Sequence, residues 1–513
     1  MPSTDTTSST PLHRHPLAPA WLEPRRDTDD LEAALFPADT RRDAEGRLVI
    51  GGADVETLAQ QHGTPLYVLS EADFRARARS FREAFAAAFA PETEVDVFYA
   101  GKAFLSTHVA RWASEEGLCV DTASGGELAL ALAGGVPPQH IGLHGNNKSD
   151  AEIQRALDAG IGRIIADSLD ELERVSALAV AAGTRAPVML RLTPGVHAST
   201  HEYIATAHED QKFGLSLTPA LDLEDAEART ASGVAGTPET SEQAQASPYL
   251  GSPAWTAATR ALELPGVELR GLHAHIGSQI FEPAGFELAA SKLISFLASL
   301  RTAYGVELPE LDLGGGHGIA YTEADAPRHP EAIAKALAAT VKQACAAEDL
   351  RVPRISIEPG RAIVGPAGVT LYRVGVQKNV QVEAPDGSTT SRRYVAVDGG
   401  MSDNARGVLY DAEYSAVLAG RRVTGEHSLS RIVGKHCESG DIVVRNVYLP
   451  TATTRDDLLA VPATGAYCHS LSSNYNYLTR PAVVAVHNGD SQVLIRRETE
   501  QDMLGRDTGF AAA

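Results

Sequence analysis

The 513-residue sequence lacks a long apolar run, a secretory signal and an excess of positive charge. No stretch approaches the roughly 18–20 consecutive apolar residues that a membrane span needs. Residues 1–20 also lack the apolar core of a signal peptide. The formal net charge of −21 argues against nucleic acid as a general partner, because phosphate binding needs a basic surface. We therefore expect neither a membrane nor a nucleic-acid partner.

Cysteine is scarce as well. The sequence has 4 cysteines and no C-x-x-C motif; they are Cys119, Cys345, Cys437 and Cys468. This spacing fits neither a disulfide scaffold nor a zinc site, and it suits a reducing compartment. We expect a cytoplasmic protein without a bound metal.

Between residues 76 and 366 the chain alternates short apolar runs with helical stretches rich in Ala and Leu. The candidate strands are residues 95–99, 117–120, 141–144, 163–166, 188–192, 269–275, 310–313 and 354–357. Strands that alternate with helices are typical of a parallel sheet, and eight of them favour a closed (β/α)8 barrel over an open sheet. Residues from about 218 to 252 interrupt the pattern with a low-complexity insertion.

The pattern changes in the C-terminal part of the chain. From residue 367 to 506, apolar runs follow one another without helices of comparable length, which indicates a second, mainly antiparallel β domain. Short apolar segments in residues 44–75 are expected to contribute to this domain. Residues 1–43 are polar and rich in proline, so we expect a disordered extension, with residues 507–513 as a tail.

A lysine follows the first candidate strand of the barrel. The carboxyl ends of the strands form the active-site face of such a barrel, and Lys102 lies just beyond residue 99. Desolvation at this position lowers the pKa of a lysine amine and makes it a nucleophile toward an aldehyde. A surface lysine that ends a strand is the simpler alternative for this segment alone.

Other strand ends carry polar groups too. Asp121 follows the second candidate strand, and His275 and Ser278 follow the sixth. The imidazole of His275 is suited to stacking on a planar ring, and the hydroxyl of Ser278 is suited to binding a phosphate. His273 and His275 form an H-x-H pair, but no cluster of Cys, His or carboxylate accompanies it in the sequence, which disfavours a metal.

The last two candidate strands end in a glycine loop and in a carboxylate. Gly314, Gly315 and Gly316 would let the backbone approach a phosphate, although a tight turn is the plainer reading. Glu358 could keep a pyridine nitrogen protonated. Arg361, after Gly360, offers the paired N–H donors of a guanidinium to a carboxylate or phosphate. Nucleophilic lysine, stacking histidine, glycine loop and carboxylate are the parts that a pyridoxal-phosphate site needs.

The second domain has its own candidates. Cys437 and Glu438 lie in a polar loop before a strand, and Cys437 could donate a proton. Tyr467 lies in a comparable loop, while Arg406 and Tyr410 end a polar segment. Each of these signals is weak alone, and a structural role is the default.

Together these segments resemble the diaminopimelate decarboxylases, pyridoxal-phosphate enzymes of the alanine-racemase-like fold. The resemblance covers about residues 45–506. It includes the long stretches THEYIATAHEDQKFG at 200–214, VGKHCESGD at 433–441 and ATGAYCHSLSSNYN at 463–476. These stretches are more specific than a short motif. They favour this family over the ornithine and arginine decarboxylases of the same architecture.

The resemblance implies how the cofactor is held. Lys102 should bond covalently to pyridoxal phosphate, His275 should stack on its ring, and Asp121 should lie close by. Glu358 should contact the pyridine nitrogen. The phosphate should be bound by Ser278, Gly314, Gly315, Gly316, Gly360 and Arg361.

The resemblance also implies how the substrate, meso-diaminopimelate, is bound and protonated. Arg361, Arg406 and Tyr410 should bind substrate carboxylate, and Glu438 the distal amino group. Tyr467 should contact both cofactor and substrate. Cys437 should protonate the carbon that loses CO2, and in this family its loop comes from a partner subunit, so a homodimer is implied.

Three alternatives remain. The first is a decarboxylase of ornithine, arginine or carboxynorspermidine, against which Arg406 and Glu438 argue, because they suit a distal end with both charges. The second is a catalytically silent homologue, and the presence of Lys102 and Cys437 argues against it. The third is a racemase, but the Cys437 segment resembles the decarboxylase loop.

Overall fold

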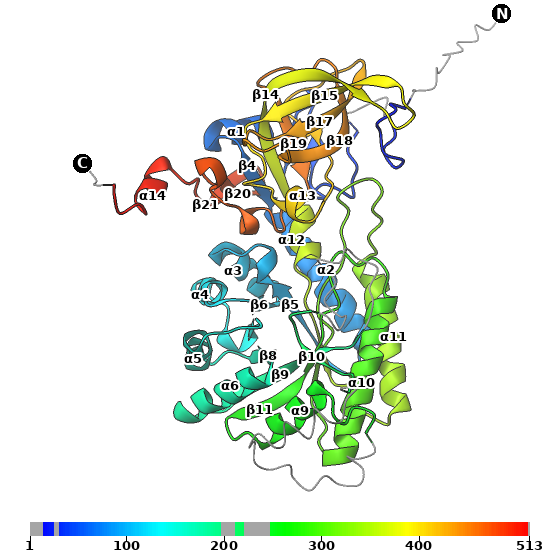
Figure 1. Cartoon of the computed structure of the whole chain (residues 1–513), viewed down its shortest axis with the longest axis vertical. Helices are drawn as coiled ribbons and strands as arrows, with labels where there is room; N and C mark the ends of the chain where they lie inside the picture. Colours follow the sequence, from blue (N-terminus) through cyan, green and yellow to red (C-terminus); the bar gives the residue numbers. More distant parts are fainter. Residues whose placement is uncertain (1–13, 25–29, 196–210, 220–246, 511–513) are drawn as a thin grey trace, which may run out of the picture. The chain divides into compact units, whose positions relative to one another are not determined.

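The computed structural model describes residues 14–24, 30–195, 211–219 and 247–510, which form two compact units (Figure 1). The barrel unit comprises residues 74–319 and 327–365. The β unit comprises residues 1–73, 320–326 and 366–513. The N-terminal and C-terminal parts of the chain therefore share one unit, and a short segment in the middle of the sequence joins them.

Eight parallel strands close the barrel, as the sequence predicts. They are β5 (Val95–Ala100), β6 (Cys119–Thr122), β7 (Ile141–Leu143), β8 (Arg163–Ala166), β9 (Ala186–Thr193), β11 (Val267–His273), β12 (Glu310–Asp312) and β13 (Arg354–Ile357). Strand β13 pairs with β5, with Ile355 beside Val95, and β8 pairs with β9, with Ile164 beside Val188. The short strand β10 (Leu215–Ser216) adds to β9 outside this ring.

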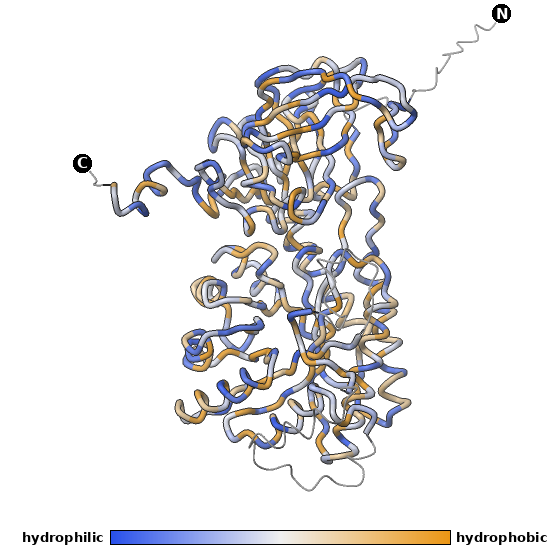
Figure 2. The backbone as a smooth tube through the Cα atoms, viewed as in Figure 1, coloured by the Kyte–Doolittle hydropathy of each residue, from blue (hydrophilic) through white to orange (hydrophobic). Residues whose placement is uncertain are grey.

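The helices of this unit are α2 (Glu71–Phe89), α3 (Thr107–Glu115), α4 (Gly125–Ala133), α5 (Asp150–Ala159), α6 (Leu169–Ala181), α9 (Pro253–Glu263), α10 (Ala284–Tyr304), α11 (Pro330–Ala347) and α12 (Arg361–Ala367). Helix α2 precedes β5, and each of the other helices of this unit follows a strand. Serine side chains cap the N-termini of five of these helices; the caps are Ser106, Ser124, Ser149, Ser168 and Ser252. Each accepts a backbone N–H of the first turn, which contributes about 1 kcal/mol. Figure 2 shows apolar residues concentrated on the strands and alternating with polar ones on the helices.

The β unit is a mixed sheet in the order β18-β17-β15-β14-β4-β20-β21. Its strands are β4 (Leu66–Ser70), β14 (Gly368–Glu383), β15 (Thr389–Val397), β17 (His427–Val433), β18 (Ile442–Pro450), β20 (Ala482–His487) and β21 (Asp490–Ile495). Strand β19 (Leu458–Pro462) also pairs with β14, and β16 (Val417–Leu418) pairs with β19. Pairings β15–β17 and β4–β20 are parallel, and the others along this order are antiparallel. The N-terminal strand β4 lies between two C-terminal strands, which joins both ends of the sequence in one core.

The segment before β4 is more ordered than its composition suggests. Strands β1 (Arg41–Arg42), β2 (Leu48–Ile50) and β3 (Ala53–Asp54) lead into helix α1 (Val55–His62). Leu35 and Phe36 are each 2% exposed and belong to the same core as Leu48 and Ile50. A disordered extension is therefore the wrong interpretation for residues 30–43. Residues 1–13, 25–29 and 196–199 lie outside the described residues, as do 220–246 of the expected insertion and 200–210 of the first long matching stretch.

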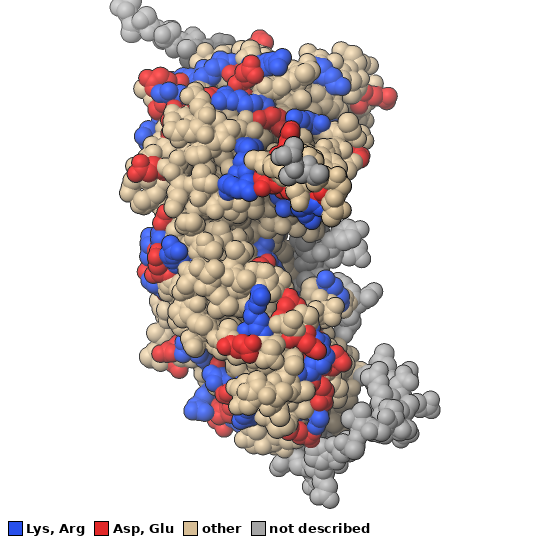
Figure 3. Space-filling view, turned by 90° about the vertical axis from the view of Figure 1, so that its left-hand side faces the viewer, with Lys and Arg blue, Asp and Glu red and all other residues tan. Residues whose placement is uncertain are grey.

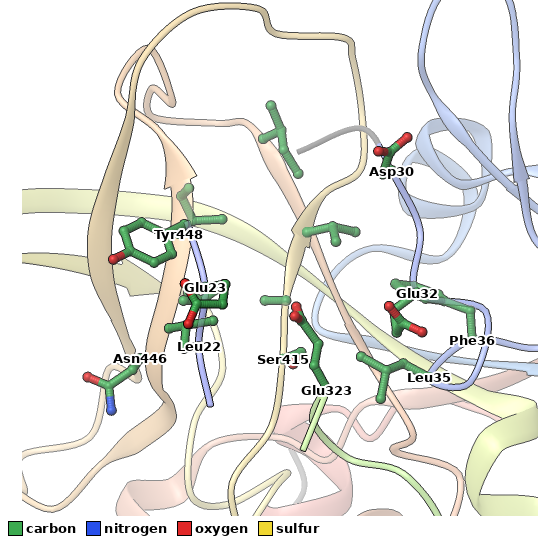
Figure 4. Close-up of a pocket in the computed structure, with 15 residues that line it drawn as sticks. Leu22, Glu23, Asp30, Glu32, Leu35, Phe36, Glu323, Ser415, Asn446 and Tyr448 are labelled. Carbon is green, nitrogen blue, oxygen red and sulfur yellow. The ribbon is translucent and has the colours of Figure 1, made fainter. Parts of the chain in front are cut away.

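The β unit also contains a pocket lined by carboxylates and apolar side chains (Figure 4). Its lining residues include Glu23, Asp30, Glu32 and Glu323, together with apolar side chains such as Leu35. None of the site residues predicted from the sequence lines this pocket. We therefore place the candidate site elsewhere.

Two further properties concern the surface. On the face shown in Figure 3, Lys and Arg side chains are interspersed with Asp and Glu rather than gathered into one basic area. Among the described helices, none combines the length and apolar character needed to cross a bilayer.

Candidate active site

The barrel brings the chemically important residues of six strands to one rim. Lys102 lies in a 3-10 turn, Gly101–Ala103, directly after β5, and Asp121 lies within β6 rather than after it. The remaining residues end or follow their strands; they are His144 after β7, His273 at the end of β11, Gly314 after β12 and Glu358 after β13. Because all eight strands are parallel, these carboxyl ends meet on the same face. Lys102 and Glu358 follow paired neighbours, since β13 is hydrogen-bonded to β5.

A buried cluster of carboxylates and imidazoles forms the centre of this rim. The Oε1 of Glu358 lies 3.0 Å from Nε2 of His273 and 3.3 Å from Nε2 of His144. His144 Nε2 also lies 3.1 Å from Oδ1 of Asp121. Asp121, His273 and Glu358 are at most 8% exposed. The sequence reasoning missed His144, which is the last residue of the candidate strand 141–144 and follows β7 in the structure.

Arg163 supplies the positive charge of the cluster. Its Nη2 lies 2.6 Å from Oδ2 of Asp312, 3.5 Å from Asp121 and 3.8 Å from Glu358. Its guanidinium also stacks 3.4 Å from the ring centre of Phe98. The sequence reasoning missed Arg163 and Asp312 too. Arg163 begins β8 and Asp312 ends β12, so neither stands out in the sequence, although a buried charged residue is usually paired.

Burial disfavours the charged form of each group in this cluster, so it raises the pKa of the carboxyl groups and lowers the pKa of the imidazoles. It raises the pKa of Asp121 to about 7 and raises the pKa of Glu358. It lowers the pKa of His273 to about 3 and holds the pKa of His144 well below its usual range. Both imidazoles are therefore neutral at neutral pH, so Arg163 is the group that balances the carboxylates.

Replacing Arg163 with Met should lower the free energy of unfolding by about 3–5 kcal/mol, because it leaves buried carboxylates without their cation. Denaturant unfolding of the purified protein measures this change. Arg155→Met on the exposed side of α5 is the matched control and should change stability by less than about 0.5 kcal/mol. Equal stability of the two variants would contradict the role given to Arg163.

The glycine loop packs against the ends of neighbouring strands. Gly314 and Gly316 have φ of +70° and +114°. A Cβ on Gly315 would lie 2.1 Å from the carbonyl oxygen of Glu358, so no side chain fits there. The backbone N–H of Gly315 donates to Nδ1 of His275 at 3.3 Å. The loop therefore brings its backbone, His275 and Glu358 together.

The remaining predicted phosphate ligands are on the same rim. Arg361 donates from Nη2 to the hydroxyl of Ser278 at 2.8 Å. A Cβ on Gly360 would lie 2.8 Å from the carbonyl oxygen of Ala100, so this turn packs against the strand that leads to Lys102. The structure thus brings together every barrel residue that the sequence predicted for the cofactor.

These residues fit pyridoxal phosphate. Buried atoms of the cluster that make no hydrogen bond within the described residues include both oxygens of Asp121, Oε1 of Glu358 and both ring nitrogens of His273. Buried polar atoms are normally hydrogen-bonded, so these atoms suit a polar ring placed among them. Glu358 would be the carboxylate that contacts the pyridine nitrogen. The glycine loop, Ser278 and Arg361 would bind the phosphate.

A metal is the competing interpretation of the same cluster. His144, His273 and Glu358 have ligand atoms within 4.8 Å of one another. The sequence showed no further metal-ligand residues near the H-x-H pair. For His273 this prediction was wrong, because the fold places His144 and Glu358 beside it. The Arg163 guanidinium, 3.8 Å from Glu358, nevertheless disfavours a second cation there.

The other predicted residues lie in the β unit. Arg406 begins helix α13 (Arg406–Leu409) and is 6% exposed, and its Nη1 donates to the hydroxyl of Tyr414 at 2.6 Å. Among the described residues no carboxylate lies within 4.0 Å of its guanidinium. Tyr410, at the end of this helix, and Tyr467, in the loop after β19, are half-buried.

Cys437 and Glu438 are exposed on the loop between β17 and β18. The backbone N–H of Cys437 donates to Oδ1 of Asn476 at 3.1 Å, and Glu438 accepts a hydrogen bond from Tyr475. The neighbouring His436 is buried, and its Nδ1 lies 2.8 Å from Asp441. The loop is thus held by its surroundings while the side chains of Cys437 and Glu438 stay accessible.

The chain is similar to known proteins over most of its length. Residues 71–237 and 251–365 match the family described as pyridoxal-dependent decarboxylase, pyridoxal binding domain. Diaminopimelate decarboxylase of Mycobacterium leprae is 46% identical over 495 residues, which is 96% of each chain. The Bacillus subtilis enzyme of the same name is 42% identical over 471 residues, covering 92% of this chain and 97% of the relative.

Solved structures give the same result. Diaminopimelate decarboxylase from M. jannaschii, in complex with L-lysine, superposes with a TM-score of 0.78 at 30% identity, covering 92% of this chain and 98% of the other. The Helicobacter pylori enzyme with L-lysine gives a TM-score of 0.72 at 26% identity, covering 88% and 98%. With the barrel rim and these similarities taken together, the chain belongs to the family of diaminopimelate decarboxylases.

Proposed function

We propose that this chain uses pyridoxal phosphate to remove CO2 from meso-2,6-diaminopimelate and release L-lysine, the last step of lysine biosynthesis. The observation that carries the proposal is the placing of Lys102 and the buried Glu358 after paired strands on one barrel rim. The nearly full-length similarity to diaminopimelate decarboxylases supports the same reaction.

Lys102 would hold pyridoxal phosphate through its amine. Glu358 would pair with the ring nitrogen and favour its protonated form, and His275 would offer its imidazole to the ring. Asp121 and the neutral His144 and His273 supply polar contacts close to Glu358. When bound, pyridoxal phosphate accepts the electron pair that CO2 leaves behind.

Phosphate binding falls to backbone and side-chain donors of the same rim. Gly314, Gly315 and Gly316 offer backbone N–H groups, and Ser278 a hydroxyl. Arg361, next to Gly360, offers a guanidinium to the phosphate or to the substrate carboxylate. The hydrogen bond between Arg361 and Ser278 already orients both side chains.

The distal end of the substrate is recognised by charge. Arg406, with Tyr410 beside it on α13, binds the distal carboxylate, and Glu438 binds the distal amino group. Tyr467 contacts both cofactor and substrate. The buried guanidinium of Arg406 has no carboxylate partner among the described residues, which favours an anionic ligand. Ornithine or arginine would leave this charge unpaired, so the site discriminates against them.

Cys437 donates the proton that replaces CO2 on the reacting carbon. We propose that its loop reaches the active site of a second copy of the chain in a homodimer. The loop is exposed, and it lies beside Tyr475, which hydrogen-bonds to Glu438 and is 41% exposed; Tyr477 is 81% exposed. Exposed aromatic side chains in a group are typical of a protein interface. The 4 cysteines are free, which suits a cytoplasmic location.

The direct test is release of L-lysine and CO2 from meso-diaminopimelate by the purified protein loaded with pyridoxal phosphate, with ornithine and arginine assayed in parallel. We expect turnover of diaminopimelate at least about a thousandfold above the other two, because a buried charge left unpaired rejects them strongly. Preferred turnover of ornithine or arginine would reject the role of Arg406 and Glu438. Cofactor binding without any turnover would indicate a silent homologue.

A further inference from the structure

Two tyrosines hold the guanidinium of Arg406. Its Nη1 donates to the hydroxyl of Tyr414 at 2.6 Å, and its Cζ lies 4.5 Å from the ring centre of Tyr321. The two rings meet edge to face, with centres 5.1 Å apart and planes at 78°. This arrangement is favourable for aromatic pairs, so each ring helps to fix the other.

Tyr321 lies near Arg406 because a short segment between two barrel elements belongs to the β unit. The segment 320–326 belongs to the β unit, although the sequence on both sides of it belongs to the barrel unit. Tyr321 is 5% exposed and Tyr414 is 2% exposed, so neither is a surface side chain. Nothing in the sequence pattern identifies them as partners of Arg406, since they are separated from each other by more than ninety residues.

The hydroxyl of Tyr414 is itself anchored. It lies 3.6 Å from Sγ of the buried Cys468. Burial raises the pKa of Tyr414 well above its usual value, so the phenol keeps its proton. A neutral phenol can accept from Arg406 and donate toward Cys468 at the same time.

We propose that Tyr414 and Tyr321 are positioning residues that aim the Arg406 guanidinium and thereby set the selectivity of the site for ligands with a distal carboxylate. The inference rests on the proposed function, because it takes Arg406 as the group that binds this carboxylate. Among the described residues, the hydroxyl of Tyr414 is the only hydrogen-bond acceptor of the guanidinium. The other N–H donors are left to bind an anion.

The physical reason is the planar geometry of the guanidinium group. A guanidinium binds a carboxylate best through two parallel hydrogen bonds, which require its plane to have the right direction. The Tyr321 ring restricts the tilt of that plane, and the Tyr414 hydroxyl restricts its rotation. Loss of either contact leaves the positive charge of Arg406 in place but lets the guanidinium plane adopt several orientations. Binding of the distal carboxylate then weakens, while the chemistry at the reacting end of the substrate is unchanged.

The test compares two ligands that differ by the distal carboxylate alone. L-Lysine, the proposed product, carries it, and 1,5-diaminopentane does not. In the holoenzyme, Tyr414→Phe and Tyr321→Leu should each weaken inhibition by L-lysine about tenfold, the size expected for one hydrogen bond to a charged group. Inhibition by 1,5-diaminopentane should stay within about twofold. The KM for diaminopimelate should rise by a similar factor with kcat retained.

A control variant separates positioning from general damage. Tyr448→Phe removes a phenol hydroxyl that accepts from the backbone of His15 in the same unit, and it should change neither inhibition constant. Equal weakening of both ligands in Tyr414→Phe and Tyr321→Leu, or no weakening of L-lysine, would overturn the inference.

Arg406→Ala distinguishes this inference from the proposed function. If Arg406→Ala loses the preference for L-lysine and the tyrosine variants keep it, the positioning role is wrong and the role of Arg406 stands. If Arg406→Ala keeps the preference, the proposed role of Arg406 fails, and the inference fails with it.

Discussion

Lys102→Ala is expected to abolish the visible absorbance of the bound cofactor and to lower turnover by about a thousandfold or more. The reason is that the amine of Lys102, directly after β5, is the group proposed to bond to the cofactor aldehyde. A spectrum of the purified variant after addition of pyridoxal phosphate, followed by the lysine-release assay, measures both effects.

Lys335→Ala is the matched control, since Lys335 is an exposed lysine on α11. It should retain the absorbance band and the wild-type rate. A band that persists in Lys102→Ala at wild-type intensity would show that another amine holds the cofactor. In that case the barrel rim would still be the cofactor site, but Lys102 would leave the mechanism.

Cys437→Ala is expected to keep the absorbance band and lose turnover by about a hundredfold or more, as removal of a general acid does. The side chain lies on an exposed loop whose backbone is held by Asn476, so the substitution should leave the fold intact. Ser439→Ala, at another exposed position of this loop, is the control and should keep the wild-type rate. A near-normal rate in Cys437→Ala would remove the thiol from the mechanism.

The same variant tests the homodimer. If Cys437 serves the partner subunit, a hybrid dimer of Lys102→Ala and Cys437→Ala chains contains one site with both groups intact. Random mixing of equal amounts should then recover about a quarter of the wild-type activity from two inactive proteins. No recovery after subunit exchange, with dimers present, would mean that each chain uses its own Cys437.

The fold class could be predicted because the barrel strands are short apolar runs between amphipathic helices. All eight predicted strands are present, and only their ends differ by a few residues. For the β unit the sequence predicted a mainly antiparallel domain but no strand order. The parallel pairing of β4 with β20 joins segments from opposite ends of the sequence, so no local pattern could reveal it.

The site could be predicted where its residues form a local pattern. The glycine loop at 314–316 and the segment around Glu358 are examples, since each follows a strand with several unusual residues together. Single residues such as His144, Arg163 and Tyr414 gave no such pattern. They become recognisable only after the fold brings them to Glu358, Asp312 and Arg406.

The N-terminal segment shows a different limit. Residues 30–43 have the composition of a disordered segment, yet Leu35 and Phe36 are buried in the core of the β unit. Two apolar side chains are enough to anchor a polar segment when a preformed sheet offers them a place. The average composition of the segment does not reveal the two apolar side chains that anchor it.

The proposed reaction removes one carboxylate from diaminopimelate and replaces it with a proton. The most direct measurement is NMR of the products that the holoenzyme forms from meso-diaminopimelate in deuterium oxide. We expect L-lysine with one deuteron on the carbon that lost CO2, in equal amount to the CO2 released. Diaminopimelate that exchanges or racemises without CO2 release would contradict it and would indicate a racemase.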